Sequence, residues 1–380
     1  MSGDGRLRIL FSGMVAGQPR QGGATWAVLQ YVASLRSLGH EVVLVEPLPK
    51  DVDLAPGGDV VRYFRSLPLL EGSAALLPEG ASETVGLPFE WLRAFASGAD
   101  LLLNVSGMLR DERLLEPIPV RAFLDLDPGF NQVWHESGVD MGLDLHNRHV
   151  TVGLNVGGED CHVPTCGRSW IKTAPPVALD LWPAAGEAPA GAAVTSVGHW
   201  RSYGSVERDG LRYGQRAHSL RELIELPRLA GERFQLALGI HPDEDRDLRA
   251  LWANGWELVD PYRVAASPDA YADFIRGSAA ELSVAKSGYV VSRSGWFSDR
   301  SGCYLASGRP VIAQQTGWDG LLPSGEGLLS FTDADGAAAA VEEVRGAWRR
   351  HSEAARRLAV DELDGRKVME RLLERLAAIY

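Results

Sequence analysis

The sequence predicts an α/β fold built from two doubly wound parallel sheets, one in each half of the chain. Short apolar runs that suit buried parallel strands alternate with segments of helical periodicity. This alternation stops in a segment rich in Pro, Gly and Ala at 184–193 and then begins again, which is typical of a linker. At 380 residues the chain is also longer than one ordinary hydrophobic core, so two domains are expected.

The first half opens with a strand–helix–strand unit. Leu7–Phe11 is a continuous apolar run, and apolar side chains then recur at helical spacing from Ala24 to Leu38. Gly39 follows, where glycine commonly ends a helix, and Glu41–Val45 is the next strand. Further strands are predicted at 100–105, 120–126 and 150–155. We expect this first domain to cover residues 1–185.

The second half repeats the pattern. Strands are predicted at 193–197, 234–238, 282–285 and 311–313. The domain is expected to cover residues 186–350, and the charged segment 351–380 is expected to be helical.

Composition excludes several classes of protein. The net charge of −12 argues against a nucleic-acid surface, because phosphate binding needs a basic face. Since no apolar run approaches the length of a membrane span and the start lacks a signal-peptide core, no integral membrane segment is expected. Three cysteines in the chain do not suggest a disulfide framework, so a cytoplasmic protein is predicted. No resident cofactor or metal is expected.

The most informative segment is 281–329. It is predicted to contain a buried strand, a Gly- and Ser-rich loop, a helix that begins at Ser298-Asp299-Arg300-Ser301, and a second strand. A helix N-terminus presents free N–H groups and the positive end of the helix dipole, so it is suited to an anion such as a diphosphate. Arg300 would add charge, and Ser298 and Ser301 would add hydroxyl donors. The simpler interpretation is that Ser298 and Asp299 only cap the helix.

Residues 21–46 and 281–329 resemble the corresponding segments of GT-B glycosyltransferases. The resemblance implies two Rossmann-like domains that face a cleft, a C-terminal segment that crosses back to the first domain, and transfer of a sugar from a nucleotide donor without a metal. Many retaining members carry two glutamates beside the second segment, but Gly295 and Cys303 occupy those positions here. The stereochemistry of transfer is therefore left open.

Donor-binding residues follow partly from the residue pattern and partly from this resemblance. Gly22 and Gly23 allow a substrate to approach the first helix closely. Arg201 is the first choice for a cation near the diphosphate, with Arg216 second, and Tyr262 lies where the family binds the nucleobase. The predicted donor site comprises Gly22, Gly23, Arg201, Tyr262, Lys286, Ser298, Asp299, Arg300, Ser301, Thr316 and Gly317.

Asp127 and His146 are the catalytic candidates. Asp127 follows a predicted strand, at the edge where open α/β sheets bind ligands, and we expect it on the acceptor side. An inverting transferase needs a base, and His146 is favoured over the nearby His135 and His149. Asp125 and Asp127 also spell the DxD pattern of metal-binding transferases, an interpretation that we consider weaker.

Other functions stay open. A nucleotide-sugar epimerase would share the fold, and the missing acidic pair favours a catalytically silent protein that binds a sugar nucleotide or a partner. Glu46 ends the second strand, where dinucleotide-binding folds place a ribose-binding acid, so an NAD-dependent dehydrogenase is a weaker alternative. Cys161, His162 and Cys166 make a weak case for zinc. The expected partners are a nucleoside diphosphate sugar and an acceptor.

Overall fold

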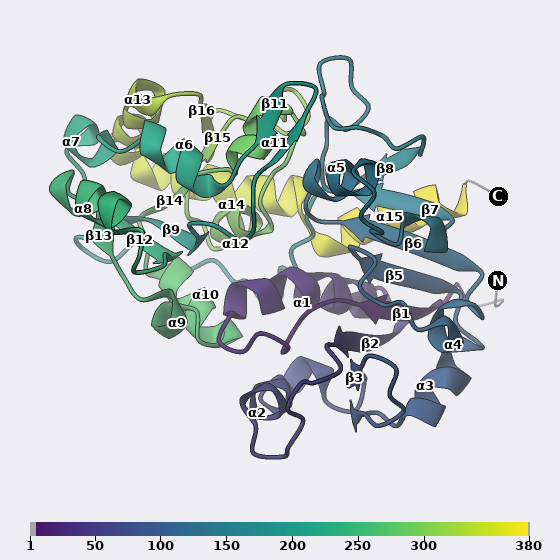
Figure 1. Ribbon diagram of the computed structural model, residues 1–380. Coiled ribbons are helices and arrows are strands. Elements are labelled where there is room, and N and C mark those ends of the chain that lie inside the picture. Colours follow the sequence, from purple (N-terminus) through teal and green to yellow (C-terminus); the bar gives the residue numbers. More distant parts are fainter. Residues whose placement is uncertain (1–4, 379–380) are drawn as a thin grey trace.

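The computed structural model describes residues 5–378 and has two parallel sheets, each with helices on both faces (Figure 1). This confirms the predicted fold class. All neighbouring strands in the first sheet are parallel except β3 and β4. In spatial order this sheet comprises β4 (Val85–Gly86), β3 (Ala74–Pro78), β2 (Glu41–Leu48), β1 (Arg8–Ser12), β5 (Leu101–Val105), β6 (Val120–Asp125), β7 (Arg148–Thr151) and β8 (Trp170–Lys172).

The second sheet is parallel throughout. In spatial order it comprises β13 (Glu257–Leu258), β12 (Phe234–Gly239), β9 (Val194–His199), β14 (Ala280–Ser283), β15 (Val311–Gln314) and β16 (Leu328–Phe331). A separate antiparallel hairpin of β10 (Val206–Arg208) and β11 (Leu211–Tyr213) leaves this domain after β9. The boundary near residue 185 stays a prediction.

Helices cover both sheets, and no helix among residues 5–378 is long and apolar enough to cross a membrane. The first domain holds α1 (Gly22–Ser37), α2 (Asp59–Arg65), η1 (Pro68–Leu70), α3 (Phe89–Ala96), α4 (Glu112–Leu115), α5 (Phe130–Glu136) and η2 (Leu143–Leu145). The remainder are α6 (Arg216–Glu222), α7 (Leu226–Ala230), α8 (Asp245–Ala253), α9 (Pro261–Val264), α10 (Pro268–Arg276), α11 (Ser287–Val291), α12 (Asp299–Ala306), α13 (Ala334–Gly346), α14 (Trp348–Glu362) and α15 (Gly365–Ala377).

Strand order places the functional region. In the first sheet β1 lies between β2 and β5, and in the second β9 lies between β12 and β14. Since successive crossovers leave these strands in opposite directions, each sheet has a switch point at its carboxyl edge, where open α/β sheets bind ligands. The helix α1 follows β1 and lies between the two domains (Figure 1). Its Trp26 donates from Nε1 to the carbonyl of Pro268, 2.9 Å away, at the start of α10.

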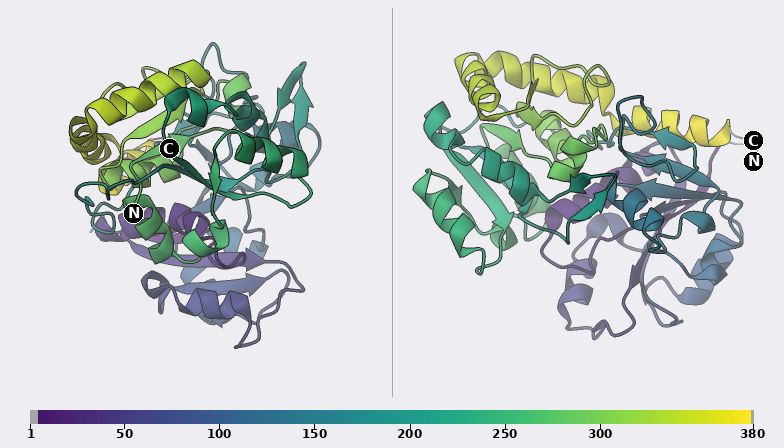
Figure 2. Two further views of the ribbon diagram at one scale, coloured as in Figure 1. Left: turned by 90° about the vertical axis from the view of Figure 1, so that its left-hand side faces the viewer. Right: turned by 45° about the horizontal axis from the view of Figure 1, so that its top comes forward.

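The C-terminal helices return to the first domain. α14 packs on the second domain against α12, whereas α15 packs against α1 and β8, as both views in Figure 2 show. The crossing is fixed where the backbone of Val177 exchanges 2.8 Å hydrogen bonds with Leu363 and Gly365. Gly365 begins α15 so close to α1 that a Cβ on it would lie 1.9 Å from the Ser34 hydroxyl.

Gly365→Ala is therefore expected to lower the free energy of unfolding by about 1–3 kcal/mol, because the added methyl group forces α15 away from α1. Urea unfolding measures the effect. The matched control is Gly346→Ala in α13, where a Cβ would meet nothing within 4 Å. That control should be neutral or stabilising by up to about 1 kcal/mol. Equal stability of both variants would contradict tight packing of α15.

Candidate active site between the domains

A cavity of about 400 Å³ lies between the two domains. Its wall is formed by the residues that follow β1, β6, β9 and β14, and by the first turns of α1 and α12. Seven of the predicted site residues line it, namely Gly23, Asp127, Tyr262, Lys286, Ser298, Asp299 and Arg300. Six others do not, namely Gly22, His146, Arg201, Ser301, Thr316 and Gly317.

The first turn of α1 faces the cavity through Gly23 and Ala24. The backbone N–H groups of this first turn have no hydrogen-bond partners within the helix, as at any helix N-terminus. Gly22 is turned away, because its N–H donates to the Ala265 carbonyl at 2.7 Å and a Cβ on it would lie 2.2 Å from the Ser267 carbonyl oxygen. Gly22 was predicted to contact the donor, but in the structure it packs against the second domain instead.

Glu46 holds the loop in front of α1 in place. Its buried carboxylate accepts hydrogen bonds from the N–H groups of Ala16 and Gly17, both at 2.7 Å. A carboxylate used in this way is not presented to a ribose, so the structural basis for the NAD-dependent alternative is absent.

The first turn of α12 supports both sequence interpretations of Ser298. Its hydroxyl accepts from the Arg300 N–H at 3.2 Å, which is a helix cap, and the residue also lines the cavity. Asp299 lines the same cavity, and burial raises the pKa of its carboxyl group. Ser301 faces the sheet instead, where its hydroxyl donates to Ser283 at 3.0 Å. Ser301 is therefore a packing residue.

Arg300 was predicted to offer its charge to the diphosphate, but a carboxylate already holds it. Its Nε donates to Glu281 Oε1 at 2.5 Å, and Glu281 is fully buried in β14. Burial by itself lowers the pKa of Arg300, but the charge and hydrogen bond of Glu281, together with Tyr271 and Asp299, outweigh burial and raise the pKa above the ordinary range. The pair is close to neutral, so Arg300 contributes less to anion binding than the sequence suggested.

Arg216 is a buried cation that makes no ion pair with any residue among 5–378. It is 8% exposed, its Nε donates to the Val284 carbonyl at 3.0 Å, and its Nη1 has no hydrogen-bond partner among the described residues. Gly198 makes room for it, because a Cβ there would lie 1.9 Å from Nη1. Burial, and next the charge of Arg300, lowers the pKa of Arg216 to about 9. An unpaired donor on a cavity wall is suited to an anion from outside.

Lys286 and Asp127 join the two domains. The ammonium donates to both carboxylate oxygens of Asp127, at 3.1 and 3.0 Å, and the hydroxyls of Tyr203 and Tyr289 donate to the same carboxylate. The ammonium also lies 5.0 Å from the centre of the Phe130 ring. Burial lowers the pKa of Lys286. Asp127 would have to leave this network before it contacted an acceptor, so the geometry favours a role in joining the two domains over its predicted role as an acceptor-side catalytic carboxylate.

His146 lies away from the cavity, inside the first domain. Its ring is hydrogen-bonded to the Asn104 side chain at 3.0 Å and to the Gly142 carbonyl at 2.7 Å. Burial lowers its pKa to about 4. A base must reach the hydroxyl that it deprotonates, so His146 is no longer a candidate.

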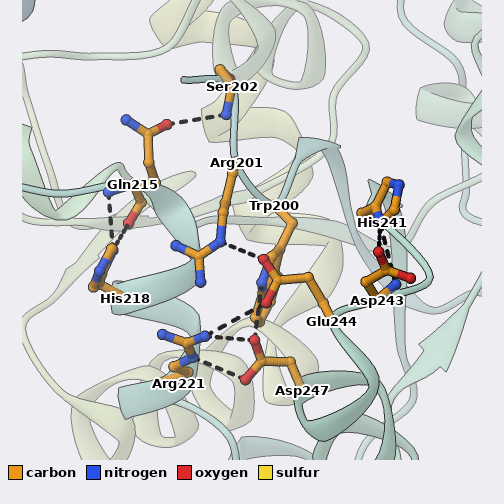
Figure 3. Close-up of polar contacts among 10 residues, drawn as sticks. All are labelled: Trp200, Arg201, Ser202, Gln215, His218, Arg221, His241, Asp243, Glu244 and Asp247. Carbon is orange, nitrogen blue, oxygen red and sulfur yellow. Dashed lines mark hydrogen bonds and ion pairs between the residues drawn. The ribbon is translucent and has the colours of Figure 1, made fainter. Parts of the chain in front are cut away.

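Arg201 does not line the cavity either. Its side chain points toward Glu244 (Figure 3). Its Nε donates to Glu244 at 2.5 Å, and the adjacent Arg221 binds Asp247. These four charges fix the segment after β9 to α8. Gln215, in the same view, accepts from the Ser202 N–H, and its Nε2 then has no partner among the described residues.

Two other residues that were predicted to contact the donor instead make hydrogen bonds within loops of the second domain. Thr316 donates its hydroxyl to the Trp296 carbonyl at 2.7 Å, and Gly317 donates its N–H to the Gln315 side chain at 3.0 Å. Tyr262 does reach the cavity and remains largely exposed, with the Arg20 guanidinium 5.6 Å from its ring centre. Its ring is open to stacking by a ligand.

The metal interpretations are not supported. The carboxylate of Asp125 is fully buried and accepts from Asn131, Gln132 and Thr151, each within 2.8 Å. Within residues 5–378, no three His, Cys, Asp or Glu side chains are grouped to hold a metal ion. Cys161 and Cys166 are free thiols.

The two positions where retaining relatives carry glutamates are closed by packing. Gly295 has φ 72°, and a Cβ on it would lie 2.3 Å from the Asn155 nitrogen. Cys303 is buried in α12 beside Gln30 of α1. A carboxylate cannot fit at the first position, so this cavity works with other groups.

Two facing domains with parallel sheets, and a cavity between their carboxyl edges, define the GT-B fold. The solved structures that this chain resembles have that fold. An alpha-glucosyltransferase in complex with UDP-glucose and DNA containing an abasic site is 12% identical, with a TM-score of 0.61 over 98% of this chain and 100% of that chain. AviGT4, a glycosyltransferase involved in avilamycin A biosynthesis, is 15% identical, with a TM-score of 0.56 over 98% and 97%.

The sucrose-phosphate synthase of Thermosynechococcus elongatus is 13% identical, with a TM-score of 0.55 over 98% of this chain and 100% of that chain. No protein-family model matches the sequence, and no curated protein sequence is similar to it. The resemblance predicted from residues 21–46 and 281–329 is confirmed, and at these identities it shows the fold.

Proposed function

We propose that this chain is a glycosyltransferase that moves a sugar from a nucleoside diphosphate donor to an acceptor without a metal ion. The observation that supports this most is Arg216, a residue of the cavity wall whose buried Nη1 has no hydrogen-bond partner among the described residues. The first turns of α1 and α12 border the same cavity. A guanidinium together with helix N-termini forms a site for a diphosphate.

The chemistry follows from where charge develops. An acceptor oxygen forms a bond to the anomeric carbon while the bond from that carbon to the diphosphate breaks, and the electron pair leaves with the diphosphate. Arg216 and the N–H groups of Gly23 and Ala24 would stabilise this charge. The acceptor also loses a proton. Asp299, which lines the same cavity and whose pKa burial raises, is our candidate to receive this proton from the acceptor hydroxyl.

The remaining parts of the proposal concern the partners. Tyr262 would stack on the nucleobase, since its ring is exposed at the cavity. With a net charge of −12, a nucleic-acid acceptor is not proposed, although DNA is present with one of the structural neighbours. A cytoplasmic location is also proposed, because free thiols such as Cys161 and Cys166 are typical of a reducing compartment.

Nucleoside diphosphates are expected to raise the melting temperature in the presence of EDTA, because a ligand that binds only the folded state stabilises it. The screen would compare UDP, dTDP, GDP, ADP and NAD. One diphosphate should give a shift that grows with concentration, and the matching nucleotide sugar should then be consumed when an acceptor is supplied. The control is Arg201→Ala, which changes a cation outside the cavity and should keep the shift.

Each other outcome of this screen favours a different function. A shift from NAD alone would support a dehydrogenase. Isomerisation of the nucleotide sugar without an acceptor would support an epimerase. Nucleotide binding without turnover would support the catalytically silent protein, which the closed positions at Gly295 and Cys303 already favour over a retaining enzyme of the usual kind. No shift at all would contradict the donor site.

A further inference from the structure

His199 lines the cavity at the end of β9, and the sequence analysis did not select it. Its ring makes no hydrogen bond to any other residue within 5–378, although the ring is only partly exposed. The His146 ring, by contrast, lies away from the cavity and is held by Asn104 and Gly142. The ring nitrogens of His199 are therefore available to a ligand.

The position of the ring is nevertheless well defined. On the β12 side it rests against Gly239, where a Cβ would lie 2.9 Å from His199 Cδ2 and 3.5 Å from its Nε2. On the α6 side the preceding residue, Gly198, is in contact with the Arg216 guanidinium. His199 and Arg216 both line the cavity, and the charge of Arg216 acts on the His199 ring.

The charges around the ring are positive. Arg216 from α6 and Lys286 after β14 are the charged groups that act on it, and Asp127 neutralises Lys286. Burial, followed by these two cations, lowers the pKa of His199. With the cavity empty, the imidazole is therefore neutral near pH 7.

A bound nucleoside diphosphate sugar would reverse the sign of the electrostatic potential at the His199 ring, because it brings two negative charges to Arg216. We infer that His199 takes up a proton when the donor binds, and that its imidazolium then serves as the second cation of the diphosphate site. The Gln215 amide, with its free Nε2 on the same wall, adds a neutral donor beside it. This inference rests on the proposed function.

The sign of the pH dependence follows. Since the bound state holds the proton more tightly than the free state, donor affinity should be highest at low pH and should fall as pH rises through the pKa of the complex. Where the slope is steepest, donor affinity should fall by about tenfold for each unit of pH. UDP-glucose is the probe, because both of its phosphates are esterified and keep a constant charge across this range. Asp299 faces the same cavity and is the other group that could supply such a slope.

The test is calorimetric titration with UDP-glucose in two buffers of different ionisation enthalpy, which counts the protons taken up, between about pH 6 and 8. The wild type should take up as much as one proton for each donor molecule bound. His199→Gln should take up none, bind more weakly and lose the pH dependence, whereas His199→Arg should bind without pH dependence. His241→Gln, which alters an exposed ring beside Asp243, and Asp299→Asn should both retain proton uptake.

Two results would overturn the inference by itself, namely donor binding by the wild type without proton uptake, or proton uptake that persists in His199→Gln. Proton uptake that disappears in Asp299→Asn but not in His199→Gln would move the role to Asp299. If the wild type binds none of the nucleotides in the melting-temperature screen, the proposed function fails, and this inference fails with it. The two failures are therefore distinguishable.

Discussion

Arg300→Ala is expected to lower the free energy of unfolding by about 3–5 kcal/mol, because it leaves the Glu281 carboxylate buried without a counter-charge. Glu281 Oε2 already has no hydrogen-bond partner among residues 5–378, so Arg300 is its main compensation. Urea unfolding measures the loss. A change of this size would also weaken nucleotide binding indirectly, so Arg300→Ala by itself is a poor test of the donor site.

The control is Arg201→Ala, which removes an exposed ion pair with Glu244 and should cost less than about 1 kcal/mol. Replacing both partners, as in Glu281→Gln with Arg300→Met, should recover much of the stability, because no unpaired charge remains. If Arg300→Ala unfolds like the wild type yet no longer binds nucleotide, then Arg300 contacts the donor as the sequence first suggested.

Arg216→Ala is expected to weaken binding of the donor diphosphate by about a hundredfold, or about 3 kcal/mol, because it removes a charged group that would be paired only in the complex. Without ligand, the variant should lose only about 1 kcal/mol of stability, since it loses the hydrogen bond to the Val284 carbonyl but breaks no ion pair. Calorimetric titration and urea unfolding measure the two effects separately.

Arg309 provides the matched comparison. It is also buried, at 1% exposure, but its guanidinium donates to the carbonyls of Arg276 and Gly186 within 3.0 Å. Arg309→Met should therefore destabilise the protein by about 1–3 kcal/mol and leave nucleotide affinity unchanged. If Arg216→Ala proves equally destabilising, Arg216 is a structural residue and the main support for the proposed function is lost.

The fold was predictable because most of its strands are buried on both faces. Such strands are continuous apolar runs, so those at β1, β2, β5 and β9 stand out in the sequence. β8 and β13 have three and two residues, and a periodic pattern cannot be recognised at that length. The strand β3 was missed because prolines and glycines surround its short apolar run.

The site was predictable only in part. Contiguous motifs at the helix starts, such as Gly23 and Ser298, were found, because the function of a helix N-terminus depends on local sequence. Arg201 was preferred to Arg216, but of the two only Arg216 lines the cavity. After Arg201 the chain leaves the cavity to form the β10–β11 hairpin, and it returns to the cavity at Arg216. Whether a cation is paired, as Arg300 is and Arg216 is not, depends on contacts between distant segments.

The return of α15 to the first domain has a consequence for biosynthesis. A ribosome releases β1 to β8 early, but the helix that covers α1 is among the last segments to emerge. The first domain therefore cannot complete its packing during its own synthesis, although domains commonly fold in order from the N-terminus. Its exposed α1 surface must wait until the second domain has been made. Nascent chains should thus acquire full protease resistance in the first domain only after the second domain and α15 have emerged.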